Sequence, residues 1–193
     1  MRWWLILVLL FLFASCSSIN FPHHDISPIG EYDIWIDPTF SSDQFRIIVQ
    51  SFNEWEKETN ATVRFHRVER APLLGRPFIA IWRSTHKEIY SQKSVIKDHT
   101  PGITVGLTMY HGYDAAVLLD YDMGQSIFHD VALHEIGHCL NLDHVEDAKY
   151  DGQTIMRPIT SQFSSYLTCF DMNNFCKLWQ CSPSEMPLCK SNI

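Results

Sequence analysis

The spacing of three histidines, His134, His138 and His144, constrains the fold of this chain more than any other feature of its sequence. On an α-helix the first two lie one turn apart on the same face, so both imidazoles can reach one metal ion. His144 can reach that ion only if the helix ends abruptly and the chain reverses. Asn141 stands where this reversal is needed, and asparagine tolerates the left-handed backbone conformation of such turns. The sequence therefore predicts a helix over about 126–141 that ends in a sharp turn.

The residue types at these positions indicate a catalytic metal site. Three neutral histidines bind Zn²⁺ and leave a fourth position open to water, which is typical of catalytic rather than structural zinc. Glu135 follows the first histidine and can accept a proton from that water. An H-E-x-x-H segment alone also occurs in helices that bind no metal, so the third histidine is the stronger signal.

Two segments together are similar to a known signature. HEIGHCLNLDH, residues 134–144, followed by TIMRP, residues 154–158, resembles the metzincin zinc proteases, whose signature is H-E-x-x-H-x-x-G-x-x-H with a later Met-turn. Asn141 replaces the glycine of that signature. The match is closest to the matrixins, the matrix-metalloprotease type, because Pro158 stands where astacins and serralysins carry tyrosine and Val145 where adamalysins carry aspartate.

This resemblance implies a zinc-dependent endopeptidase with one catalytic Zn²⁺, which hydrolyses polypeptides by a metal-activated water. It assigns metal binding to His134, His138 and His144 and the role of general base to Glu135. It also places Met156 in a Met-turn beneath the ligands and Pro158 in the wall of the main specificity pocket.

One departure from the family concerns additional ions. Matrixins hold a second zinc and calcium ions before the last strand of the sheet, with regularly spaced histidine and aspartate ligands. Here Asp114, Asp120 and Asp122 are present, but apolar Leu118 stands near the expected histidine. We therefore do not carry these ions over to this chain. Ca²⁺ stays possible but is not supported by the ligand pattern.

Hydrophobic patterning predicts about five strands and three helices, the zinc site lying on the second helix. The resemblance implies that they form an α+β fold of the metzincin, or zincin-like, type with a twisted mixed sheet. Runs rich in β-branched and aromatic residues predict the strands, which we place at 31–37, 62–68, 78–82, 103–110 and 115–120. Capping-box pairs, Ser41 with Gln44 and Thr168 with Asp171, begin the first and third helices, which end near 60 and 180. A substrate would lie extended along an edge strand, either 103–110 or 115–120.

The N-terminus has the features of an export signal. Eleven apolar residues, Trp3 to Phe13, are too few to span a bilayer but fit a signal peptide over 1–16. FASC resembles a bacterial lipobox, which would make Cys16 a lipid-modified residue and the protein a membrane-anchored lipoprotein of the cell envelope. Ordinary cleavage after Cys16, giving a secreted protein, is the alternative. Residues 17–30 read as a linker, 31–180 as the catalytic domain and 181–193 as a cysteine-containing tail.

Composition limits the partners. Lys and Arg number 15 against 22 Asp and Glu, and the net charge of -7 argues against binding to nucleic acid. We expect a monomer whose partner is a polypeptide substrate, with membrane contact through the lipid alone.

The six cysteines separate by position. Cys139 lies within the histidine helix and is expected to be a buried thiol. The last four occur without a C-x-x-C pair, so two disulfides are favoured over a zinc knuckle, with three connectivities open; these cysteines are Cys169, Cys176, Cys181 and Cys189.

Two other functions stay open on the sequence alone. A zinc hydrolase in the envelope could instead cleave cell-wall peptide amides. A non-catalytic, lipid-anchored binding module could keep the zinc for structure, although such a module has no need of Glu135.

Overall fold

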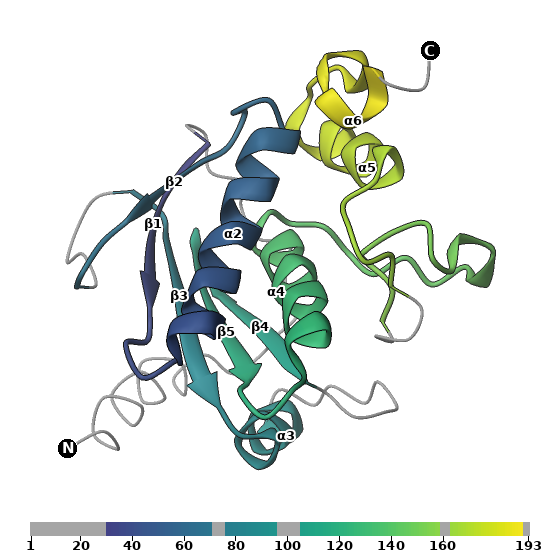
Figure 1. Cartoon of the computed structure of the whole chain (residues 1–193). Helices are drawn as coiled ribbons and strands as arrows, with labels where there is room; N and C mark the ends of the chain where they lie inside the picture. The colour runs from purple at the N-terminus through teal and green to yellow at the C-terminus, as the bar shows by residue number, and fades with distance from the viewer. Residues whose placement is uncertain (1–29, 71–75, 96–104, 159–162, 191–193) are drawn as a thin grey trace.

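The computed structural model describes residues 30–70, 76–95, 105–158 and 163–190 (Figure 1). It has a five-stranded, mostly parallel sheet in the order β2-β1-β3-β5-β4, with helices packed against it. The α+β class and all five predicted strands are therefore confirmed. The strands are β1 (Glu31–Ile36), β2 (Arg64–Arg67), β3 (Phe78–Ser84), β4 (Gly106–His111) and β5 (Asp114–Asp120).

The three predicted helices are present as α2 (Ser42–Glu58), α4 (Gln125–Cys139) and α5 (Cys169–Trp179). Two further α-helices, α3 (His86–Val95) and α6 (Pro187–Lys190), occur in the described part of the chain, so three is too low a count. Among the described helices, the histidine helix is consequently the third in order and not the second. The sequence did not predict α3 because this helix has almost no apolar periodicity. Among its described side chains, Ile89 is the one that is fully buried.

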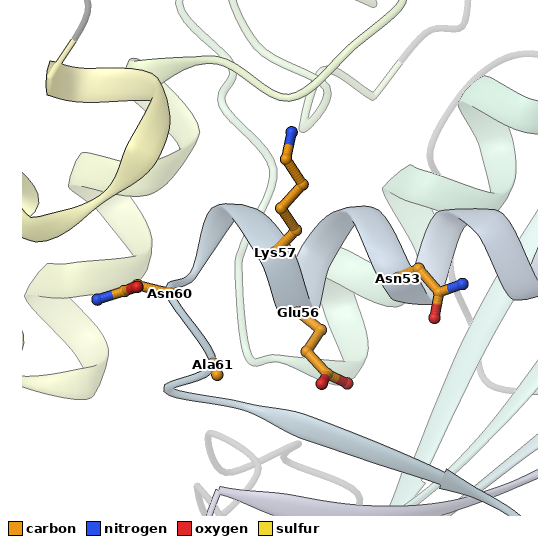
Figure 2. Close-up of a pocket in the computed structure, with 5 residues that line it drawn as sticks. All are labelled: Asn53, Glu56, Lys57, Asn60 and Ala61. Atoms are coloured by element: carbon orange, nitrogen blue, oxygen red, sulfur yellow. The ribbon is translucent and has the colours of Figure 1, made fainter.

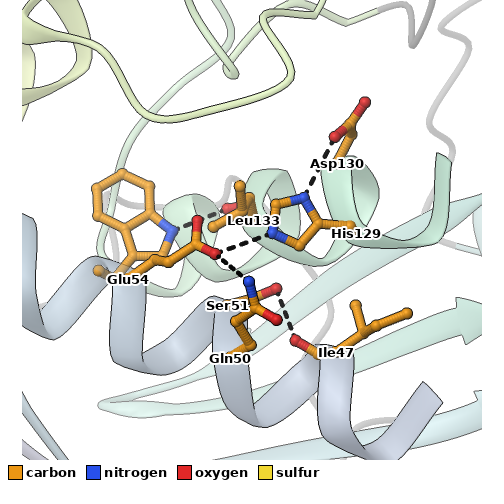
Figure 3. A network of polar contacts seen from close by, with 8 residues as sticks. Ile47, Gln50, Ser51, Glu54, His129, Asp130 and Leu133 are labelled. Carbon is orange, nitrogen blue, oxygen red and sulfur yellow. Dashed lines mark hydrogen bonds and ion pairs between the residues drawn. The ribbon is translucent and has the colours of Figure 1, made fainter. Parts of the chain in front are cut away.

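Helices α2 and α4 lie side by side over one face of the sheet (Figure 1). Alternate strand residues such as Ile34, Ile79 and Val117 are buried in the core between the sheet and these helices. The indole N–H of Trp55 on α2 donates to the carbonyl of Leu133 on α4 over 3.0 Å, within a polar network that joins the two helices (Figure 3). This packing makes α4 a rigid platform.

The two strands considered for substrate binding differ in position. β4 lies at one edge of the sheet, whereas β5 is paired with β3 on one side and β4 on the other. The expectation that 115–120 could be the substrate edge is therefore wrong, because a strand that is paired on both sides has no free backbone hydrogen-bonding edge. Of the two, only β4 can accept an added strand.

The C-terminal segment packs as part of the same body. Disulfides join Cys169 to Cys189 and Cys176 to Cys181, which resolves the open connectivity. Residues 183–185 form a short 3-10 helix, and Met186 beyond it is 1% exposed and joins the core. The segment expected as a tail thus contributes to the fold.

The N-terminal predictions lie outside the described residues. The signal peptide over 1–16, the lipidation at Cys16 and the linker up to 29 are therefore still predictions from sequence. Among the described helices, none has the length and apolar character needed to cross a membrane.

Candidate metal centre

Helix α4 presents the first two histidines to a common point. The Nε2 atoms of His134 and His138 are 3.0 Å apart, as their separation by one helical turn predicts. His134 is only 5% exposed, so its imidazole is shielded from bulk water.

The helix ends where the sequence predicts it should. Asn141 has a φ of 71°, in the left-handed region. Its N–H donates to the His138 carbonyl over 2.7 Å, and the N–H of Leu142 donates to the Gly137 carbonyl over 3.1 Å. This pair of hydrogen bonds is a Schellman motif, which satisfies the last carbonyls of the helix and turns the chain back.

The turn brings the third histidine to the first two. The Nε2 atom of His144 is 3.2 Å from that of His134 and 3.1 Å from that of His138. Within the described ranges, these three residues form the one group of three or more histidine, cysteine or acidic side chains close enough to hold a metal ion. All three predicted ligands therefore converge, and together they could bind one ion.

The far side of each helix histidine is fixed by a backbone carbonyl. Nδ1 of His134 is 2.8 Å from the Ile155 carbonyl oxygen, and Nδ1 of His138 is 2.7 Å from that of Leu142. A carbonyl only accepts, so each Nδ1 carries the proton and each Nε2 presents its lone pair.

The charge state of these rings suits metal binding. Burial lowers the pKa of His138 to about 3, with the nearby His144 adding to the effect. Burial likewise lowers the pKa of His134 well below its usual value, and the two neighbouring histidines contribute. Both rings are neutral at physiological pH, and neutral imidazole is the form that binds metals.

Met156, which the resemblance places in a Met-turn, packs against α4 between the two helix histidines. Met156 is 1% exposed, and a Cβ added to Gly137, between the two helix histidines, would lie 3.3 Å from the Met156 Cε and 3.2 Å from Trp55. Gly137 is therefore required for the close approach of Met156 to α4. The carboxylate of Asp171 on α5 accepts hydrogen bonds from the Thr154 hydroxyl and from the Ile155 N–H, at 3.3 Å for the latter.

The same segment also holds the loop of the third ligand. The N–H of Val145, directly after His144, donates to the Met156 carbonyl over 2.7 Å. Arg157 donates from Nη1 to the Val145 carbonyl, and its Nε lies 2.8 Å from the Asp151 carboxylate. We call these two contacts of Arg157, with Val145 and with Asp151, the clip. The Arg157 side chain is 4% exposed, whereas the Asp151 side chain is 42% exposed.

Glu135 is buried beside the histidines at 5% exposure. The hydroxyl of Thr108 on β4 donates to Glu135 Oε2 over 2.5 Å. Burial raises the pKa of Glu135 to about 7, and the Thr108 hydrogen bond opposes that rise. Because its pKa lies near neutral pH, the Glu135 carboxyl group can both accept and release a proton there.

The segment after the Met-turn returns to the site. The ring of Phe163 stacks on His134 with centroids 4.7 Å apart and an angle of 12° between the planes. Pro158 is half-buried directly after Arg157, and residues 159–162 lie outside the described part of the chain. The role of Pro158 as a pocket wall stays a prediction.

A separate hollow of about 430 Å³ lies at the C-terminal end of α2 (Figure 2). It is lined by Asn53, Glu56, Lys57, Asn60 and Ala61. None of these is a histidine or cysteine, and Glu56 already accepts the Phe65 N–H over 3.2 Å. We assign the chemistry to the histidine cluster and not to this open hollow.

Leu118 pairs in register with Trp82 on β3 and with Leu107 on β4, so it offers no metal ligand near the position where matrixins carry a histidine. Whether the protein binds further ions stays a prediction. Cys139 is fully buried and unpaired by disulfide, and burial raises the pKa of its thiol, so it is an inert core residue and not a ligand.

Several residues of the site are not found by the sequence analysis. Gly137 had a signal, because a glycine inside a helix destabilises it unless close packing requires one. Thr108 and Gly106 on β4 had none, because only the fold brings that strand onto α4. Asp171 was expected to cap α5, which it does, but its bond to Thr154 depends on tertiary contact.

Comparison with known proteins gives no match, either to a protein family or to a curated protein sequence. The geometry of the site is therefore the basis for inferring a function.

Proposed function

We propose that this protein is a zinc-dependent endopeptidase of the metzincin type, similar to the matrixins. The observation that carries the proposal is the convergence of three Nε2 atoms within 3.0 to 3.2 Å of one another, next to a buried carboxylate on the same helix.

The donor set fits zinc. Zinc–nitrogen bonds of about 2.0–2.1 Å in a tetrahedral arrangement separate the nitrogen atoms by about 3.3–3.4 Å. The separations of 3.0 to 3.2 Å between the Nε2 atoms agree with this within a few tenths of an ångström. Three lone pairs facing one another repel, and a shared cation removes that repulsion. The hydrogen bonds at Nδ1 orient the rings in the way that zinc-binding histidines require.

Glu135 supplies the proton chemistry. His134, His138 and His144 would hold the zinc, which would supply Lewis-acid chemistry to the scissile carbonyl and to water near neutral pH. Glu135 accepts a proton from the attacking water and returns it to the leaving amine as the carbon–nitrogen bond breaks. β4 provides an edge along which an extended peptide can add as a further strand.

The buried carboxylate favours catalysis over a structural role. Burying an ionisable group destabilises a fold unless other interactions compensate, and a structural zinc site has no use for one. Glu135 is 5% exposed and lies between two ligands on α4. This observation argues against a non-catalytic binding module, and the edge strand favours extended peptides over cell-wall amides.

The test compares wild type with Glu135→Ala. We expect both proteins to bind one zinc per chain, and we expect the variant to cleave a peptide library about 10²- to 10⁴-fold more slowly because it lacks the general base. Glu146→Ala, which removes an exposed glutamate near the site, is the matched control and should cleave like wild type.

Three outcomes would contradict the proposal. Wild type that binds no zinc contradicts the metal site, and a Glu135→Ala protein that cleaves at the wild-type rate contradicts the mechanism. Cleavage of purified cell wall without cleavage of any peptide would move the substrate to the cell-wall class.

We also propose that the protein is exported and anchored by a lipid on Cys16. The two disulfides support export, because such bonds persist in oxidising compartments. Mass spectrometry of the mature N-terminus tests the anchor. An acylated Cys16 is expected, and an unmodified N-terminal Ser17 would exclude lipidation.

A further inference from the structure

Strand β4 contacts Glu135 directly. A Cβ built on Gly106 would have Glu135 atoms as its three nearest neighbours, with Cδ and Cγ at 2.8 Å and Oε1 closer still. Real Cβ atoms do not approach other atoms this closely, so any side chain at position 106 displaces the carboxylate. Gly106 therefore leaves the space that the Glu135 side chain occupies.

Thr108 lies two residues further along the same strand and so faces the same side. Its hydroxyl is 2.5 Å from Glu135 Oε2 and 3.2 Å from the Glu135 carbonyl oxygen. A threonine hydroxyl has one proton, and the shorter contact assigns it to the carboxylate. One oxygen of Glu135 is thus held by Thr108, while the other lies against Gly106.

We propose that Gly106 and Thr108 form a seat that fixes the Glu135 carboxylate, and that both are positioning residues for the reaction. The role in the reaction rests on the proposed function, whereas the seat itself does not. Gly106 sets the side-chain conformation by exclusion, and Thr108 sets the orientation of the carboxylate by its hydrogen bond.

The position of the seat links substrate and base. β4 is an edge strand, and its outer backbone groups are those with which an extended peptide would pair. The same strand that aligns the peptide therefore fixes Glu135. One rigid element then determines the distance between the scissile bond and the carboxylate, which is the geometric requirement for general-base catalysis.

A double-mutant cycle on thermal unfolding tests the seat without any activity measurement. The proteins are wild type, Gly106→Ala, Glu135→Ala and the double variant. We expect Gly106→Ala to lower the melting temperature of wild type by several degrees but to have little effect when Glu135 is already alanine, because the clashing atoms are gone. Gly124→Ala is the matched control, since a Cβ there meets nothing within 4 Å.

Equal shifts in the melting temperature on Gly106→Ala in both backgrounds would overturn the seat. This result is independent of peptide cleavage, so it separates the failure of the seat from the failure of the proposed protease function.

A second experiment tests the positioning role of Thr108. Thr108→Val keeps the shape and removes the hydroxyl, and Thr108→Ser keeps the hydroxyl. We expect Thr108→Val to lower kcat by about 10- to 100-fold, as loss of a supporting hydrogen bond does in metal sites, with KM and zinc affinity changed less than about twofold. Thr108→Ser should restore most of kcat.

The role is overturned if Thr108→Val has the kcat of wild type, if serine is as impaired as valine, or if the loss of activity follows a loss of zinc in a chelator competition. If wild type itself cleaves no peptide, the protease function fails, and the unfolding cycle alone decides whether the seat exists.

Discussion

Two of the histidines belong to a helix and the third to a loop, and the two parts of the site are held in different ways. His134 and His138 are fixed by the backbone of α4, and the Nδ1 of each bonds to a carbonyl. His144 follows the turn at the end of α4, and its neighbour Val145 is joined to segment 154–158 through both its N–H and its carbonyl.

The difference shows which contacts are local and which depend on the whole fold. The helix positions two histidines by sequence spacing alone, whereas the loop that carries the third needs a partner distant in sequence. Segment 154–158 serves both parts, because Ile155 accepts from His134 and Met156 accepts from Val145. Variants that affect the shared segment should therefore impair both parts of the site, and variants of the clip or the turn should affect the third ligand most.

We expect the largest loss of stability from a change at Asp171, because Asp171 binds segment 154–158, which contacts both the helix part and the loop part of the site. Asp171→Ala leaves the donors of Thr154, Ile155 and Thr168 in a buried region without their acceptor, and unsatisfied buried groups destabilise by about 1–3 kcal/mol each. We expect the free energy of unfolding to fall by about 3–5 kcal/mol in urea denaturation, with weaker zinc binding. The Glu146→Ala protein should be within about 0.5 kcal/mol of wild type. An Asp171→Ala protein of wild-type stability would show that the segment is supported elsewhere.

The turn between the two parts comes next. Asn141→Val places a β-branched residue at a φ of 71°, which should destabilise the protein by about 1–3 kcal/mol and displace His144. Asn141→Gly removes the steric cost and should keep both stability and zinc affinity. Urea unfolding and chelator competition measure the two quantities. If the Asn141→Val and Asn141→Gly proteins have the same stability and the same zinc affinity, the left-handed turn does not position His144.

We expect the clip that Arg157 forms with Val145 and Asp151 to affect zinc binding more than folding. Arg157→Met keeps most of the side-chain volume but removes the hydrogen bond to the Val145 carbonyl and the ion pair with Asp151. We expect the affinity for zinc to fall by about 10- to 100-fold in a competition with a fluorescent chelator, because the loop of the third ligand loosens. Arg46→Met removes an exposed pair with Asp43 and should leave the affinity unchanged. Equal affinities for the Arg157 variant and wild type would contradict the clip.

The parts of the molecule that the sequence predicts are those whose signals are local. The spacing of the histidines and the left-handed preference of Asn141 act within one helix and one turn, and both are confirmed. Helix α3 had a local signal as well, since Thr85 and Glu88 form a capping box with bonds of 2.8 and 3.2 Å. The capping box alone does not predict a helix, because apolar residues must also recur at helical spacing, and α3 has little such periodicity.

The rest could not be predicted because it depends on tertiary contacts. Nothing in the order of residues places Thr108 against Glu135, since β4 and α4 meet only after the sheet has formed. The exclusion of β5 as a substrate edge likewise depends on strand order and not on strand composition. The buried contact of Arg157 with Val145 joins two loops, and a single arginine in a sequence does not reveal its partner.

The smallest expected change in stability concerns the polar contact that joins α4 to α2. His129 on α4 lies 3.1 Å from Glu54 on α2 and 3.4 Å from Asp130 (Figure 3). The hydrogen bond with Glu54 raises the pKa of His129 above 6.5, and the same bond lowers the pKa of Glu54 below 4.5. The stabilisation that His129 contributes is complete below pH 6.5 and is lost as the pH rises through the raised pKa of His129. The stabilisation that Glu54 contributes is complete above pH 4.5 and is lost as the pH falls through the lowered pKa of Glu54. The pair therefore stabilises the protein most between these two limits.

His129→Gln should lower the free energy of unfolding near pH 5.5 by only about 0.5–1 kcal/mol, because the pair is partly exposed to solvent. At pH 8 the loss should be smaller, because His129 has lost its charge there. His86→Gln, at an exposed position on α3, is the control, and subtracting the wild-type profile measured at the same zinc concentration removes the titration of the metal ligands. A difference between His129→Gln and wild type that is constant from pH 5 to pH 8 would show that His129 joins the helices by packing and not by charge.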